Sequence, residues 1–192
     1  KISQFRSLSF SYPGPRKLSD ITNLPLLKEV NQPTINEIWS KYHDSRTDTI
    51  GTSLKADEYE VLKEMAKKCP LFVFPVFRGE AGGYFLLLSQ FQQTHFLFTF
   101  LEEFVRNSNT APPYMSISLY SDLLESKKIC LLRVDVMEAL MDKSEATKVL
   151  DLLKKCYLND GELRKYLETF NQRPNEFDVD SYIKKLMSMN DF

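Results

Sequence analysis

Apolar residues recur every three to four positions early in the chain, the spacing of one face of a helix. In PTINEIWSKYH, residues 33–43, this stripe consists of Ile35, Ile38, Trp39 and Tyr42. Thr34 and Glu37 fit a capping box, with Pro33 just outside the helix. The pattern predicts a helix whose lone Trp39 belongs to the core rather than to a platform for a ligand.

Further helical stripes follow at residues 56–69 and in the last third of the chain. The later segments are 144–157, 161–170 and 178–187. Asp142 and Glu145 can cap the first of these three helices.

Six other segments read as strands because they are apolar throughout or alternate with a period of two. They are residues 48–54, 71–78, 84–93, 95–104, 114–120 and 128–137. Pro75 lacks a ladder donor and predicts an edge or a bulge. In YMSISLY, Met115 and Ile117 should face inward, and Ser116 and Ser118 outward. Hairpin-length links between the middle strands predict mostly antiparallel pairing.

The segment HFLFTFLEEF, residues 95–104, is read as one strand throughout. Its Phe side chains at 96, 98, 100 and 104 then share a face, and Glu102 and Glu103 point to opposite faces. Such a Phe face is either core or, where helices leave it open, a patch for another protein.

The order of elements predicts an α+β fold, one domain with a mostly antiparallel sheet of about six strands flanked by helices. We expect an irregular N-terminal arm at residues 1–32, since Pro13, Gly14 and Pro15 forbid a helix there, with 24–30 docking the arm on the body. The helix-flanked domain is expected at residues 33–192.

Composition narrows the functional class. With 25 basic and 26 acidic residues the net charge is -1, so nothing favours nucleic acid as a partner. Cys69, Cys130 and Cys156 are widely spaced in apolar surroundings, which predicts buried, reduced thiols and a reducing compartment. No apolar run approaches a membrane span, so no membrane insertion is expected. Residues 1–19 are basic, rich in Ser and free of acids, which fits either a transit-peptide remnant or an ordinary flexible arm.

Candidate chemistry is sparse. His43 and His95, the two histidines, lack metal-ligand spacing with the cysteines. His43 is expected at a helix C-terminus and His95 at the start of a strand. There is no G-x-S-x-G elbow and no phosphate-binding loop. We therefore predict no catalytic residue, no metal and no cofactor. The alternative is an α+β domain that binds or hydrolyses a small molecule with His95 and a carboxylate.

The connector ETFNQRPNEF, residues 168–177, is unusually rich for a joint between two helices. Asn171 suits a left-handed C-cap, Pro174 prevents continuation, and Arg173 can bind a carboxylate. A structural role explains much of the segment. The alternative is contact with a partner by Arg173, Glu176 or Phe177.

Four segments together resemble a known family. They are FVFPVFR, THFLFTFLEEF, KKICLLRVDV and ETFNQRPNEF, and the motif IW-x-x-YH (Ile38, Trp39, Tyr42, His43) precedes them. In this order they resemble the mitochondrial ATP synthase F1 assembly chaperones that bind the beta subunit, from about Thr34 to Phe177. The resemblance implies a chaperone of the mitochondrial matrix without catalytic activity, which holds unassembled F1 beta until alpha replaces it.

The resemblance also implies how the chain behaves. Its partner would be the F1 beta subunit, and the free chain would be a monomer. Contact residues do not transfer from the family position by position, so Arg173, Glu176 and Phe177 remain the expected partner-binding residues. A rival class is a structural subunit that stays in the mature ATP synthase.

Overall fold

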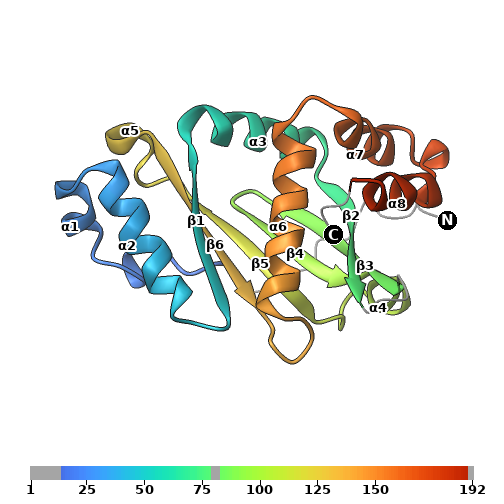
Figure 1. Ribbon diagram of the computed structural model, residues 1–192, viewed down its shortest axis with the longest axis horizontal. Coiled ribbons are helices and arrows are strands. Elements are labelled where there is room, and N and C mark those ends of the chain that lie inside the picture. The colour runs from blue at the N-terminus through green and yellow to red at the C-terminus, as the bar shows by residue number, and fades with distance from the viewer. Residues whose placement is uncertain (1–13, 79–82, 190–192) are drawn as a thin grey trace.

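The computed structural model describes residues 14–78 and 83–189 (Figure 1). Within these ranges, six strands form one antiparallel sheet in the order β1-β6-β5-β4-β3-β2. The strands are β1 (Thr49–Lys55), β2 (Leu71–Arg78), β3 (Gly83–Gln92), β4 (His95–Phe100), β5 (Pro113–Tyr120) and β6 (Ile129–Val136). The predicted α+β class and the six-stranded antiparallel sheet are confirmed.

Helices stand before, between and after the strands. They are α1 (Leu24–Glu29), α2 (Gln32–Asp44), α3 (Ala56–Lys68), α4 (Leu101–Arg106), α5 (Leu124–Lys127), α6 (Lys143–Leu158), α7 (Glu162–Gln172) and α8 (Val179–Met187). In Figure 1, α6 crosses the sheet, α1 and α2 lie at the β1 end, and α7 and α8 lie at the β2 end.

The main core lies between one face of the sheet and α3, α6, α7 and α8. Phe96, Ile117 and Val134 are neighbours across β4, β5 and β6, and all three are fully buried. The predicted stripes of α3 and α6 meet them, with Leu62 and Leu153 also fully buried. Each such side chain contributes about 1.5–3 kcal/mol by leaving water.

A second, smaller core covers the opposite face near β1. It contains Leu18, Leu27, Ile35, Trp39, Tyr120, Leu123, Ile129 and Leu131. The Trp39 indole donates to the Leu132 carbonyl oxygen at 2.9 Å, so Trp39 is core, as predicted.

Part of the expected N-terminal arm is regular. Residues 14–32 include a 3-10 turn at Leu18–Asp20 and helix α1, and Leu27 of α1 docks on the body as expected for residues 24–30. Residues 1–13 of that arm lie outside the described residues. The division of the chain after residue 32 stays a prediction.

Helix α2 differs from its prediction in both start and buried face. Asn31 is the N-cap, accepting from the Thr34 amide at 3.0 Å, because a proline fits within the first turn. The buried stripe is Ile35, Trp39 and His43. Ile38 and Tyr42, expected inside, are 47% and 46% exposed.

The strand predicted at residues 95–104 ends at Phe100, and α4 follows directly. Glu102 and Glu103 occupy the first turn of α4 and Arg106 the last, where their charges suit the helix dipole. The period-two argument for Glu102 and Glu103 was therefore wrong. Phe104 is still buried.

Pro75 lies in β2, which is an edge strand, as its missing donor predicted. The β2–β3 hairpin is confirmed by the pairing of Arg78 with Gly83. Its turn, residues 79–82, lies outside the described residues.

Candidate functional site

Asn171, in the connector singled out from the sequence, clamps the edge strand β2. Its amide donates to the Leu71 carbonyl oxygen at 2.6 Å and accepts from the Leu71 amide at 3.2 Å. It also donates to the Leu167 carbonyl oxygen at 2.9 Å. Asn171 therefore lies within α7 and is not the predicted left-handed C-cap. Its side chain bonds the backbone of Leu71, which lies on the open edge of the sheet and has no neighbouring strand on that side.

The remaining connector residues divide into an anchor and an exposed pair. Phe177 is half-buried, with ring centroids 5.1 Å from Phe170 and 6.1 Å from Phe72. Arg173 pairs with Glu176 at 2.9 Å, and both side chains are about three-fifths exposed, at 62% and 59%. Arg173 therefore does bind a carboxylate, as predicted, and the pair is open to a partner.

His95 begins β4, as predicted, and lines a cavity of about 500 Å³ on the sheet face opposite the main core. Asp48 and Asp135 line the same cavity. Each carboxylate is held by an arginine: Arg46 Nε is 3.1 Å from Asp48, and Arg133 Nη2 is 2.6 Å from Asp135. No described residue hydrogen-bonds either nitrogen of His95. The structure therefore gathers a histidine and two acids without coupling them as a base and its orienting group.

His43 lies in the last turn of α2, as predicted, and is fully buried there. Its Nδ1 lies 2.9 Å from Thr49 Oγ1, and its ring packs edge-on against Trp39. Burial, followed by the positive charges of Arg133, Arg46 and Lys143, lowers the pKa of His43 to about 4. A neutral, enclosed ring of this kind is a packing element.

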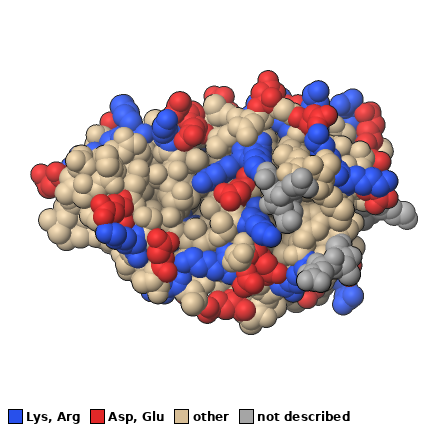
Figure 2. All heavy atoms as spheres, in the orientation of Figure 1, with Lys and Arg blue, Asp and Glu red and all other residues tan. Residues whose placement is uncertain are grey.

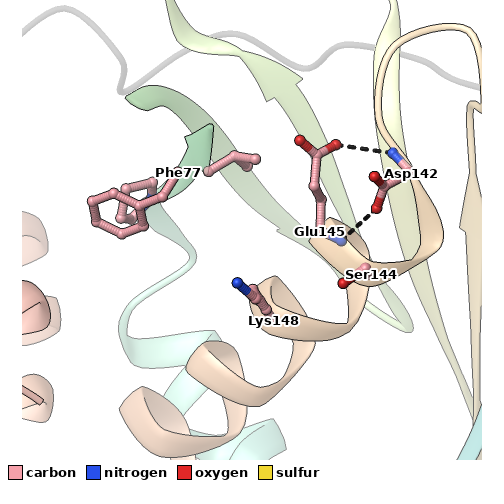
Figure 3. A pocket seen from close by; sticks show the side chains of 7 residues that line it. Phe77, Asp142, Ser144, Glu145 and Lys148 are labelled. Carbon is pink, nitrogen blue, oxygen red and sulfur yellow. Dashed lines mark hydrogen bonds between the residues drawn. The ribbon is translucent and has the colours of Figure 1, made fainter. Parts of the chain in front are cut away.

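A small cavity of about 60 Å³ lies between the end of β2 and the start of α6 (Figure 3). Its polar groups serve the helix start: Asp142 and Glu145 exchange the two hydrogen bonds of the predicted capping box, at 2.8 and 2.9 Å. Arg78 Nη2 also donates to Glu145 at 2.9 Å, and this bond lowers the pKa of Glu145. These contacts are structural.

Large apolar side chains are exposed on both α1 and α2. Leu26 is 64% exposed, and Ile38 and Tyr42 stand one turn apart on α2. Charges of both signs are mixed over the face shown in Figure 2. The exposed side chains of α1 and α2 could therefore contact a partner, but no concentration of positive or negative charge marks this face.

The described ranges contain no cluster of three or more metal-ligating side chains, and none of their helices is long and apolar enough to cross a membrane. Cys69, Cys130 and Cys156 are free and buried, as predicted. Burial raises the pKa of Cys69 to about 11 and of Cys130 to about 12, so both thiols are protonated at neutral pH.

Residues 3–183 match the model of a family described as ATP11 protein. The chain belongs to the ATP11 family. The match takes in the second core, the main core except for its last residues on α8, the cavity beside His95 and the connector at residues 168–177.

Curated relatives agree with this assignment. "ATP synthase mitochondrial F1 complex assembly factor 1" from Homo sapiens is 28% identical over 182 residues, which is 94% of this chain and 55% of the relative. The protein of the same name from Mus musculus is 26% identical over 180 residues, 93% of this chain and 55% of the relative. "Protein atp11, mitochondrial" from Schizosaccharomyces pombe is 25% identical over 135 residues, 68% of this chain and 47% of the relative. The chain spans about half the length of these relatives.

Membership of the ATP11 family confirms the resemblance inferred from the sequence motifs. Within this ATP11 chain, the structure places Arg173, Glu176 and Phe177 together at the β2 end, and their partner role stays a prediction. Sequence reasoning missed the polar cavity. The signal was present as polar residues at alternate positions, Ser116 with Ser118 on β5 and Arg133 with Asp135 on β6, which share a face.

Proposed function

We propose that this chain is a non-catalytic assembly chaperone of the mitochondrial matrix. It binds unassembled F1 beta subunits, prevents their aggregation and hands them over to alpha subunits. The supporting observation is the ATP11 family match over residues 3–183, together with human and mouse relatives named as F1 complex assembly factors.

A physical need underlies this role. A subunit of a ring that has not yet assembled exposes interfaces that the oligomer later buries, and such surfaces aggregate. A chaperone must cover these interfaces and still release the subunit for assembly. Because the chain has no phosphate-binding loop, we attribute release to competition by alpha rather than to nucleotide hydrolysis by this chain.

We place partner contact at Arg173 and Glu176, with Phe177 holding the segment in position. The exposed pair offers one charge of each sign. Because an exposed ion pair stabilises the fold by only about 0–1 kcal/mol, either side chain can leave it to bind a partner at little cost in free energy. Phe177 packs on Phe170 and Tyr182, which fixes the backbone beneath the pair.

The alternative, an enzyme using His95 and a carboxylate, is less well supported. His95 and Asp135 share a cavity, but Asp135 is bound by Arg133 and His95 has no hydrogen-bond partner among the described residues.

The decisive experiment is co-expression of the chain with F1 beta, scoring the soluble fraction of beta. We expect soluble beta in a complex with this chain. Purified alpha should dissociate this complex without added ATP. Beta that stays insoluble, or release that requires ATP hydrolysis by this chain, would contradict the proposal.

The variant Arg173→Glu tests the contact residues in the same assay. We expect a normally folded chain with about tenfold weaker beta binding, about 1.4 kcal/mol. Lys41→Glu is the control, because it breaks another exposed ion pair, that of Lys41 with Glu37 on α2. Loss with Lys41→Glu but not with Arg173→Glu would put the contact on α2, beside Ile38 and Tyr42.

A further inference from the structure

The cavity beside His95 has the properties of a binding site that the proposed chaperone role does not use. Its volume of about 500 Å³ lies within the range of small-molecule sites. Its lining comes from β4, β5 and β6, from residues 46 and 48 ahead of β1, and from residues 14–16. Segments far apart in the sequence thus converge on one polar space.

A row of polar side chains crosses three strands at this place. Ser118 pairs with His95 on one side and with Arg133 on the other. Side chains paired in this way lie on the same face, with Cβ atoms about 4.5–5.5 Å apart. Ser116 lies two residues before Ser118 on β5, so it shares the same face, and it lines the same cavity.

His95 is the unsatisfied member of this row. It is only 8% exposed, and both ring nitrogens lack a partner throughout the described residues. A buried polar group without a partner costs about 1–3 kcal/mol, so a ligand that bonds it regains that energy. Burial lowers the pKa of His95, so the neutral ring presents one N–H donor and one acceptor.

The charges indicate the ligand's sign. Arg46 and Arg133 are each bound to an aspartate of the lining, whereas Arg16 has no carboxylate partner in the described chain. Three arginines against two aspartates leave one positive charge. Asp48 and Asp135 also disfavour a ligand that concentrates two negative charges on one group, such as a phosphate dianion.

We infer that this cavity binds a carboxylate, with Arg16 holding its charge and His95 and the Ser116 hydroxyl donating hydrogen bonds. The carboxylate comes from a small organic acid or from an acidic side chain of a protein. The inference is independent of the chaperone proposal, because it concerns the isolated chain.

The test is a titration of the whole chain, followed through the ring signals of its two histidines by NMR. The probes are acetate, succinate and an aspartate blocked at both backbone ends, with acetamide as the neutral control. His43 is an internal reference, because it is fully buried at the end of α2 and does not line the cavity. We expect the carboxylates to shift His95 alone, with a Kd of about 1 mM or tighter.

Arg16→Gln should weaken this binding about tenfold, whereas Arg106→Gln, at an exposed arginine of α4 outside the cavity, should leave it unchanged. Tighter binding of succinate assigns the site to a free acid, and tighter binding of the blocked aspartate assigns it to a protein side chain. Absence of a His95 shift, an equal shift with acetamide, or equal binding by Arg16→Gln would overturn the inference.

Discussion

At the scale of single residues, Gly51 sets how closely α2 approaches the sheet. A Cβ atom at this position would lie 2.4 Å from Cδ2 of His43 and 2.9 Å from the carbonyl oxygen of Trp39. The second atom is backbone and cannot turn aside. Glycine is therefore required by close packing on the strand rather than by its own dihedral angles.

Gly51→Ala should lower the free energy of unfolding by about 1–3 kcal/mol, because overpacking forces α2 away from β1. Urea denaturation followed by Trp39 fluorescence measures this change. Gly161→Ala is the matched control, since a Cβ there meets nothing within 4 Å. Equal stability of the Gly51→Ala chain and the parent would show that α2 can move outward without loss.

His43 should make stability depend on pH. Its pKa is lowered to about 4 in the folded chain, whereas an unfolded histidine titrates near 6.5. Between these values the unfolded state binds more protons, so stability falls as the pH falls below about 6.5, by up to about 1.4 kcal/mol per pH unit. Urea denaturation at about pH 7, 6 and 5 should show a smaller dependence of stability on pH for His43→Gln than for the parent chain. Identical slopes would contradict this account.

Residue-level reasoning from the sequence succeeded for Trp39 and failed for its neighbours. Helical spacing allows two stripes, and only the one through Ile35, Trp39 and His43 meets the sheet. Gly51 was the available signal, because a glycine within a strand indicates close approach by another element. It does not say which element approaches.

At the scale of secondary-structure elements, Asn171 joins α7 to an otherwise open strand edge. Asn171→Ala removes three hydrogen bonds and leaves the Leu71 amide and carbonyl without this partner. We expect a loss of about 1–3 kcal/mol in the free energy of unfolding and faster hydrogen exchange at the Leu71 amide.

Gln172→Ala is the control for this change, because Gln172 is the exposed next residue of α7. Unchanged exchange at Leu71 in Asn171→Ala would mean that the clamp contributes nothing to the strand edge.

Most elements could be predicted from periodicity, and the exceptions have physical reasons. The period-two run of Phe96, Phe98 and Phe100 stops where Glu102, Glu103 and Arg106 take dipole-compatible positions in α4. A buried Phe104 satisfies either pattern, so apolar spacing alone cannot locate the boundary.

At the scale of the whole molecule, the antiparallel meander from β2 to β6 follows from short links, but the place of β1 does not. β1 pairs with β6, far along the chain, and this brings α2 over the face that carries Arg133. The cavity beside His95 is likewise assembled from distant segments, each with an unremarkable local pattern. The connector residues could be found because they lie together in sequence.

The pairing of β1 with β6 has a consequence for how the chain folds. The nearest pair in sequence is Lys55 with Ile129, so the first strand cannot join the sheet until the last one exists. The hairpins from β2 to β6 can form locally, whereas closing β1 onto β6 carries the entropic cost of a long loop. During synthesis, which starts at the N-terminus, Trp39 and its apolar neighbours therefore remain exposed until residue 129 and the rest of β6 have been made. Fragments that end before β6 should collect as aggregates.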